Sequence, residues 1–301
     1  MSVVRKQGSV GDQLLNWYDQ EGRNLPWRKT RNPYAILVSE VMLQQTQVDR
    51  VMQFYRMWLR RFPSWKALAR ATNAEVLQAW SGLGYNRRAL ILRDAARHIV
   101  AYGLPKTEEG WRQVKGVGAY TAAAVMAFAF RETTVPIDTN IRRVGARLLR
   151  GVAYPSPKAD ETLRRKLLIL FLESQRPFDV PQAIFDLANT FCGKIPDCIS
   201  CPLQKQCPAS AKFLIGSVRV PAMMVQKTRE HVHPGKQFPD RIYRGRILRA
   251  VQVGEVLLSA LGLQIDRTYQ KKDRIWLLAM VKRMEKDGMI RRRGARIRLA
   301  T

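Results

Sequence analysis

All four cysteines of the 301-residue chain lie within one short stretch, FCGKIPDCISCPLQKQC, residues 191–207. Their spacing is Cys192-x5-Cys198-x2-Cys201-x5-Cys207. Thiolates bind zinc and iron–sulfur clusters, and clustered cysteines in a reducing compartment favour metal over disulfides. Structural zinc sites usually have two short cysteine pairs, whereas this loop has one such pair flanked by two longer gaps. We therefore expect a [4Fe–4S] cluster here, with zinc or four reduced core thiols as the alternatives.

Two glycines in the stretch VKGVGAYTAAAVMAFAF, residues 114–130, form a second candidate site. Gly116 and Gly118 bracket Val117 between two segments with helical periodicity. The glycines let the backbone turn tightly, so that amide N–H groups at the start of the second helix face outward, where a phosphate can bind. An ordinary corner between two helices would use the same glycines, so this pattern alone leaves both interpretations open.

The charge of the chain favours a polyanionic partner. It contains 52 Lys and Arg against 24 Asp and Glu, a formal net charge of +28, and an excess of this size is typical of proteins that bind nucleic acid. The first twenty residues lack the apolar core of a signal peptide, and no run approaches the roughly 18 apolar residues of a membrane-spanning helix. We therefore expect a cytoplasmic, nucleoid-associated protein with no membrane partner.

These candidate sites need a helical scaffold to position them. Apolar residues recur at three- and four-residue intervals over most of residues 9–192, and this period predicts a mainly α fold. Helices are expected near residues 9–21, 35–61, 73–102, 107–130, 139–150, 159–175 and 180–192.

The pattern changes after the last cysteine and predicts three parts. Residues 1–212 form a helical domain that includes the cysteine loop at 192–207, and residues 213–236 are polar and unperiodic, as a linker is. Residues 237–301 show three helical segments followed by MIRRRGARIRLA, which alternates around an Arg-Gly turn. That order is typical of a small winged-helix domain. Its arginines predict contacts with DNA phosphates, and a protein-binding winged helix is the alternative.

The motifs together resemble the helix-hairpin-helix DNA glycosylases that carry an iron–sulfur loop. Along the chain they are LPWRKTRNPY, SEVMLQQTQV, GLGY, GVGAYTAAAV, DTNIRRV and the cysteine loop, over about residues 10–210. The string SEVMLQQTQV makes the chain most similar to the MutY-type adenine DNA glycosylases. The resemblance implies the helix-hairpin-helix glycosylase fold and a monomeric repair enzyme. It also implies a [4Fe–4S] cluster and excision of adenine mispaired with 8-oxoguanine or guanine in double-stranded DNA.

Two carboxyl groups are candidates for the chemistry. Breaking an N-glycosidic bond requires protonation of the departing base and stabilisation of an oxocarbenium-like cation. Glu40 lies in the apolar segment AILVSEVML, where burial favours the protonated, donating form, with a solvated helical glutamate as the alternative. Asp138 opens DTNIRRV, where a helix N-cap favours the ionised form and a purely structural cap is the alternative. The resemblance adds Asn140 to the catalytic set.

Position 120 bears on the type of reaction. Bifunctional members of the family have a lysine there that forms a Schiff base with the sugar and nicks the strand. This chain has Tyr120, and its nearest amine, Lys115, is out of register. We therefore expect a monofunctional enzyme that leaves an abasic site.

The resemblance also implies which residues contact DNA. Gln45 and Tyr85 match the residues that fill the base stack when a nucleotide is extruded, with a surface amide and a core aromatic as the alternatives. The remaining predicted DNA contacts are Gln44, Thr46, Leu83, Gly116 and Gly118. The adenine pocket is expected to contain Trp27, Arg28 and Gln182.

The chain departs from the family pattern in three places. Asn86 follows GLGY where the family often has a second aromatic, and Ala188 replaces a glycine before the first cysteine. Full-length MutY proteins carry a Nudix-like domain, which residues 237–301 do not resemble. Two other functions stay open: a thymine or uracil mismatch glycosylase, against which the string MLQQTQ argues, and a lesion-binding protein without catalysis, which the presence of both Glu40 and Asp138 disfavours.

Overall fold

The computed structural model describes residues 8–221, 230 and 232–300. The chain divides into two compact units. Unit 1 takes in Met1–Ile36, Lys106–Gln113 and Val117–Lys227, and unit 2 takes in Leu37–Pro105, Val114–Gly116 and Thr228–Thr301. No helix in the described ranges is both long and apolar enough to cross a membrane. The predicted domain boundaries near 212 and 236 stay predictions.

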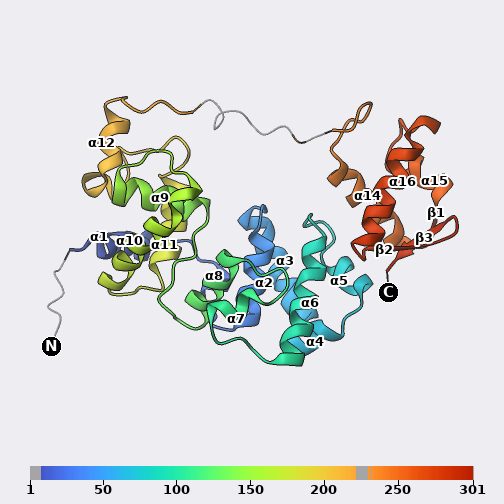
Figure 1. The fold of residues 1–301 in the computed structure, drawn as a ribbon, viewed down its shortest axis with the longest axis horizontal. Helices are drawn as coiled ribbons and strands as arrows, with labels where there is room; N and C mark the ends of the chain where they lie inside the picture. Colours follow the sequence, from blue (N-terminus) through green and yellow to red (C-terminus); the bar gives the residue numbers. More distant parts are fainter. Residues whose placement is uncertain (1–7, 222–229, 231, 301) are drawn as a thin grey trace. The chain divides into compact units, whose positions relative to one another are not determined.

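Unit 1 is built around helix α9 (Thr139–Arg150), which packs against α10, α11 and α12 (Figure 1). Its core contains Ile141 of α9, Leu167 and Phe171 of α10, and Ile184 of α11, all fully buried. Gly145 permits this close approach, since a Cβ there would lie 3.0 Å from the Leu167 side chain. The other elements of the unit are α1 (Val10–Glu21), η1 (Pro26–Arg28), α7 (Glu108–Arg112), α8 (Ala119–Ala129), η2 (Pro157–Ala159), α10 (Asp160–Glu173), α11 (Val180–Thr190), η3 (Gln204–Gln206) and α12 (Pro208–Leu214).

The first part of unit 2 is a group of helices packed on buried tryptophans, Trp58 and Trp80, whose rings meet edge to face at 5.3 Å. Three predicted helices are interrupted, because turns at residues 44–47, 80–86 and 113–118 divide the segments expected at 35–61, 73–102 and 107–130. The helices are α2 (Pro33–Leu43), which starts in unit 1, α3 (Val48–Arg61), α4 (Trp65–Arg70), α5 (Asn73–Ala79) and α6 (Arg87–Tyr102).

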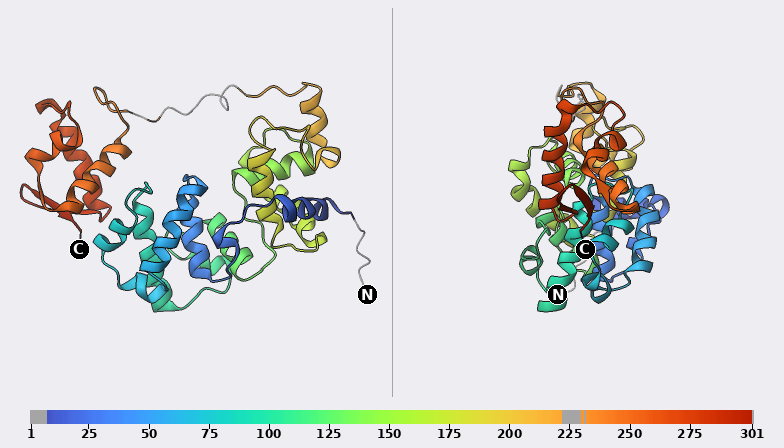
Figure 2. Two further views of the ribbon diagram at one scale, coloured as in Figure 1. Left: turned by 180° about the vertical axis from the view of Figure 1, so that it is seen from behind. Right: turned by 90° about the vertical axis from the view of Figure 1, so that its right-hand side faces the viewer.

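The second part of unit 2, which we call the tail (residues 232–300), contains the expected three helices and a hairpin (Figure 2). The two strands of the hairpin, β2 and β3, are joined by a short further strand, β1, in a three-stranded antiparallel sheet of order β1-β3-β2. Lys236 is buried in the tail between Asp266 and Asp273, with its Nζ 2.8 and 2.6 Å from their carboxylates. The elements are α14 (Asp240–Val253), β1 (Val256–Leu257), α15 (Leu258–Ile265), η4 (Lys271–Asp273), α16 (Arg274–Lys286), β2 (Ile290–Arg293) and β3 (Arg296–Leu299).

Candidate functional site

Asp138 is the N-cap of α9, as its position in the sequence predicts. One carboxylate oxygen accepts hydrogen bonds from the backbone N–H groups of Asn140 and Ile141, at 2.8 and 2.7 Å. The other accepts from the Asn140 side chain at 2.9 Å. Three donors therefore hold the carboxylate in one orientation at the positive end of a helix dipole.

The protonation balance of Asp138 differs from the expectation for a simple cap. Burial raises the pKa of this carboxyl, and it outweighs the hydrogen bonds from Ile141 and Asn140 and the charge of Arg143, which lower the pKa. The cap hydrogen bonds lower the pKa, as expected for an N-cap, but the burial of this half-buried side chain has the larger effect. An ionised carboxylate in such surroundings interacts strongly with any cation that approaches it.

Two arginines of α9 connect this cap to the cysteine loop. Arg143 donates to the Asn140 side chain at 3.0 Å and to the Cys192 carbonyl at 2.7 Å. One helical turn later, the buried Arg147 donates to the Cys192 Sγ at 3.3 Å and to the Gly193 carbonyl at 2.7 Å. The same face of α9 thus fixes both a predicted catalytic pair and the first predicted metal ligand.

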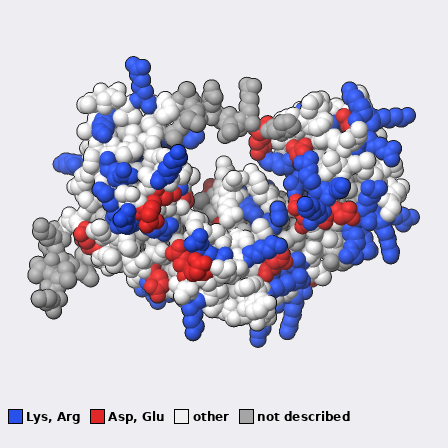
Figure 3. Space-filling view, in the orientation of Figure 1, with Lys and Arg blue, Asp and Glu red and all other residues white. Residues whose placement is uncertain are grey.

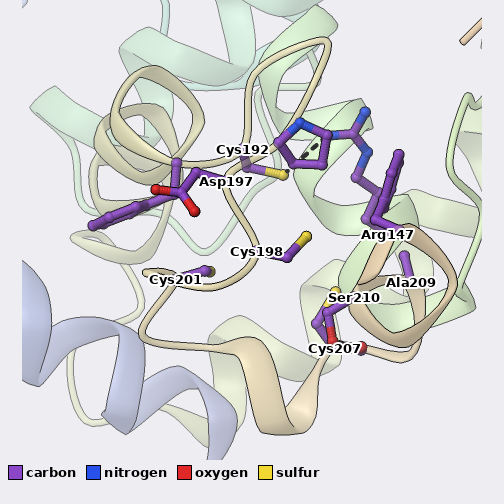
Figure 4. A pocket seen from close by; sticks show the side chains of 11 residues that line it. Arg147, Cys192, Asp197, Cys198, Cys201, Cys207, Ala209 and Ser210 are labelled. Carbon is purple, nitrogen blue, oxygen red and sulfur yellow. Dashed lines mark hydrogen bonds between the residues drawn. The ribbon is translucent and has the colours of Figure 1, made fainter. Parts of the chain in front are cut away.

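The four cysteine side chains line one pocket, with Arg147 beside Cys192 (Figure 4). None of the thiols is in a disulfide. Burial raises the pKa of Cys201 to about 11, and burial also raises the pKa values of Cys198 and Cys207. Over the described ranges, no three Cys, His, Asp or Glu side chains converge tightly enough for a single metal ion. Four thiols around one pocket beside a cationic side chain are a donor set that suits an anionic iron–sulfur cluster.

The hairpin between α7 and α8 requires one of its two glycines for steric reasons. Gly116 has a φ of +88°, and a Cβ there would lie 2.3 Å from the Ile91 side chain. Gly118 is the N-cap of α8 with ordinary φ, and nothing lies within 4 Å of where its Cβ would be. The first turn of α8 is therefore open for close approach of a ligand, and the half-buried Tyr120 lies in that turn.

Glu40 is buried on α2, with 5% of its surface exposed. Every residue of its helix from Ala35 to Met42 is buried, and apart from Ser39 the neighbours of Glu40 in this range are apolar. The alternative of a solvated glutamate is therefore excluded, and its catalytic role stays a prediction.

Gln45 and Tyr85 share an unusual backbone conformation. Their φ angles are +57° and +48°, and Arg131 is the one other described non-glycine residue with positive φ. Such conformations are costly for non-glycine residues and concentrate at functional sites. Both side chains are exposed, Tyr85 by 46%. Leu83, expected beside them as a DNA contact, is 5% exposed and packs inside the protein here.

Arg88 holds the two turns that carry these residues. Its guanidinium donates to the carbonyls of Gln44 and Gly84 and to the Thr46 hydroxyl, at 2.5, 3.1 and 3.1 Å. It also donates to the last carbonyls of α2, those of Val41 and Met42, at 2.9 and 3.0 Å. Burial lowers the pKa of Arg88 to about 10, so it remains charged at neutral pH. Its charge favourably caps the negative end of α2.

The structure brings Arg28 and Gln182 together, as predicted for a base pocket. Arg28 Nε donates to Gln182 Oε1 at 2.9 Å, and its two terminal nitrogens donate to Asp186 at 2.7 and 2.8 Å. Burial alone would raise the pKa of Asp186, but hydrogen bonds and charge from Arg28 and Arg23 lower it below the usual value. Because its donors are occupied, Arg28 here orients the Gln182 amide. Trp27 is buried next to it in the chain.

Sequence reasoning missed four residues of this arrangement, which are Arg88, Arg143, Arg147 and Asp186. Arg147 and Asp186 each lie between two apolar neighbours in a helical segment, whereas Arg88 and Arg143 each follow another arginine and precede an apolar residue. That pattern is the available signal, because a charge on the apolar face of a helix must be paired when it is buried.

The departures at Asn86 and Ala188 are accommodated, since Asn86 precedes α6 in a helical conformation and the buried Ala188 offers its carbonyl to Arg143.

Comparison with known proteins identifies the family. Residues 38–168 match the model of the HhH-GPD superfamily of base excision DNA repair proteins. The chain is 38% identical over 241 residues to the adenine DNA glycosylase of Mycolicibacterium smegmatis, which covers 78% of each chain. It is 40% identical over 223 residues to the adenine DNA glycosylase of Rattus norvegicus, and this alignment covers 70% of this chain and 43% of the rat protein. A solved structure of a thermostable thymine-DNA glycosylase has 27% identity and a TM-score of 0.62, covering 66% of this chain and 94% of that one.

The matched region spans less than half the length of the plant and mammalian relatives. The four cysteines are spaced as in the iron–sulfur loop of MutY-type proteins. The helical fold, the hairpin and the extent of the mycobacterial match agree: the chain belongs to the HhH-GPD superfamily of base excision DNA repair proteins and, within it, to the adenine DNA glycosylase family.

Proposed function

We propose that the protein is a monofunctional adenine DNA glycosylase, which excises adenine mispaired with 8-oxoguanine or guanine from double-stranded DNA. The observation that carries this proposal is the Asp138 carboxylate, held by three donors at the N-cap of α9. A fixed, half-buried carboxylate suits the stabilisation of a cation at the anomeric carbon. The names of the relatives from M. smegmatis and rat supply the base.

Each catalytic residue has one role in the proposal. Glu40, buried on α2, donates a proton to the departing adenine. Asp138, in its ionised form, faces the oxocarbenium-like sugar, and Asn140 orients it through the 2.9 Å side-chain hydrogen bond. Tyr120 stands where a Schiff-base lysine would be needed. The enzyme therefore releases the base and leaves the strand intact.

Base release requires the nucleotide to leave the stack. We assign the wedge to Gln45 and Tyr85, whose strained turns present exposed side chains. The stacking gain on insertion can offset part of the cost of unpairing the target. Gln44, Thr46 and Leu83 support this region, and the amides around Gly116 and Gly118 bind a phosphate. Trp27, Arg28 and Gln182 recognise the extruded base.

Cys192, Cys198, Cys201 and Cys207 would hold a [4Fe–4S] cluster. When bound, the cluster supplies a cross-link that holds the loop folded. The Arg147 guanidinium, 3.3 Å from Cys192 Sγ, would offset part of the negative charge of such a site. In this proposal residues 1–212 carry catalysis, 213–236 are the linker, and 237–301 are a winged-helix-like module.

The test is single-turnover cleavage of duplexes that contain A:8-oxoG, A:G, T:G or U:G, each with and without alkali. We expect adenine release from the first two, with strand breaks only after alkali. Breaks without alkali would refute the monofunctional assignment. The T:G arm tests a second candidate, thymine excision, which the similarity to the thymine-DNA glycosylase structure favours. Release of thymine with adenine retained would replace the first proposal by the second.

A further inference from the structure

The β2–β3 hairpin of the tail has one face that packs inward and one that carries only arginine. Ile290, Ile297 and Leu299 are buried. Side chains alternate along a strand, so residues at even and odd positions point to opposite faces. The four on the outward face are Arg291, Arg293, Arg296 and Arg298, all exposed. We call these four the arginine ladder.

The ladder places like charges directly opposite each other. Arg291 pairs with Arg298 across the two strands, and Arg293 pairs with Arg296. Cross-strand neighbours of like charge destabilise a sheet. A hairpin needs no charge at solvent-facing positions, and threonine or a mixed pair would stabilise it. The protein therefore carries a stability cost at this face.

The acidic residues of the tail do not neutralise the ladder. Lys and Arg outnumber Asp and Glu by 16 to 6 among residues 237–301. Asp266 and Asp273 bind Lys236 inside the tail, while Asp240 and Asp287 pair with Arg283 and Arg244. In the described part of the chain, the one carboxylate that reaches the ladder is that of Glu255, 4.0 Å from Arg296 and exposed. Such a pair contributes little in water.

Basic side chains gather over the surface of the tail (Figure 3), and the ladder is its most regular array. Alternate residues of a strand are about 6.6 Å apart, which is close to two steps of about 3.4 Å, the axial spacing of successive phosphates along one DNA strand. No aromatic residue occurs in residues 289–300. Proteins that bind single strands rely on aromatic side chains to stack bases. The spacing suits a phosphate backbone, and the lack of aromatic side chains favours a paired duplex over a single strand.

We propose that the arginine ladder binds the phosphate backbone of double-stranded DNA without reading its sequence. The bound phosphates relieve the repulsion between the paired arginines, so the face is more stable on DNA than alone. This binding gives the protein affinity for undamaged duplex. It goes beyond the proposed excision reaction, since it involves none of the residues assigned to catalysis.

The experiment compares full-length variants on an undamaged duplex by fluorescence anisotropy over a range of salt concentrations. The ladder variant is R291Q/R293Q/R296Q/R298Q. The matched control, R249Q/R267Q/K271Q/K272Q, removes the same charge from exposed tail residues outside the ladder. Each phosphate contact contributes about 0.9 to the slope of log K against log salt, so we expect the ladder variant to lose about 3 to 4. The control should lose less than half as much.

Two further measurements separate the ladder from a structural role. Thermal unfolding of the ladder variant at low salt should occur at an equal or higher temperature than wild type, because two like-charge pairs are gone. The R291K/R293K/R296K/R298K variant should keep its salt slope, since lysine also neutralises phosphate. Three results would each overturn the proposal. They are an equal loss of salt slope in the ladder and control variants, a lower unfolding temperature of the ladder variant than of wild type, and a loss of salt slope in the lysine variant. Displacement by single-stranded DNA as effective as by duplex would also overturn it. Failure of the excision assay would leave these results unaffected.

Discussion

Replacing Arg88 by methionine tests whether one buried cation holds both predicted wedge turns. The side chain is 7% exposed and donates to carbonyls on α2 and on both turns. Methionine retains much of the volume but removes every donor. Each hydrogen bond to a charged group contributes about 1.5–3 kcal/mol, and such contributions overlap rather than add. We expect the variant to lose about 3–5 kcal/mol of unfolding free energy, because several buried carbonyls lose their charged donor at once.

The assay is urea unfolding, followed by binding to an A:8-oxoG duplex under conditions where the variant is folded. Arg87→Met is the matched control, because Arg87 is exposed and its ion pair with Asp287 is 3.7 Å long. It should lose less than about 1 kcal/mol. Without Arg88, the turns can relax away from the positive φ of Gln45 and Tyr85. Lesion binding should therefore weaken even in the folded variant.

Two results would contradict this reasoning. If Arg88→Met lost no more stability than Arg87→Met, the carbonyls would be satisfied in another way and the clamp would not exist. If stability fell but lesion binding by the folded variant equalled that of wild type, the strained turns would not depend on Arg88. Arg88→Lys keeps the charge with fewer donors, and an intermediate loss is expected from it.

Four further predictions follow from the site. Asp138→Asn keeps the cap but should abolish base release. Burial raises the pKa of Asp138 above its ordinary 3.8. Ionisation of this carboxyl therefore lowers the free energy of unfolding as the pH rises from 3.8 through the raised pKa of the folded state. Calorimetry at neutral pH should therefore show an equal or higher unfolding temperature for the variant, and the wild-type single-turnover rate should fall on acidification at a pH above 3.8. Glu40→Gln should abolish release and retain lesion binding in a gel-shift assay; a near-wild-type rate would remove Glu40 from the mechanism. Tyr120→Lys should confer some strand nicking, which trapping with borohydride would detect and whose complete absence would count against the assigned register. Purified protein should contain about four irons and four sulfides per chain by elemental analysis, whereas stoichiometric zinc would exclude the cluster.

Features with local signals could be predicted from the sequence. The cysteine loop, the N-cap at Asp138 and the alternating hairpin after Met289 depend on residues close together in the chain. Local chemistry determines each of them, because a cap needs a short acceptor before a helix and a hairpin needs alternation about a turn. The burial of Glu40 followed from the apolar residues on either side of it, and the structure confirmed it.

The turns at Gln45 and Tyr85 could not be predicted in the same way. Helical periodicity continues across residues 35–61, and at Gln45 itself no glycine or proline marks the left-handed conformation. The turn around Gln45 is bound by Arg88, which lies more than forty residues after Gln44 in the chain. Long-range hydrogen bonds of this kind outweigh local preference, and no periodicity records them. The same holds for Asp186, whose partner Arg28 comes from another helix far earlier in the chain.

Helix α9 shows why such long-range contacts matter for function. An arginine-rich helix is usually a solvated one, yet Arg142 pairs with Asp160 at 2.6 Å, and Arg143 and Arg147 face the cysteine loop. Because Arg143 binds both Asn140 and the Cys192 carbonyl, a displacement of the loop must also disturb the hydrogen bond that orients Asp138. Residues about fifty positions apart are thereby held in one rigid arrangement. If the loop holds a cluster as proposed, poor cluster binding would also displace the Asp138 carboxylate, although none of the four thiols contacts it.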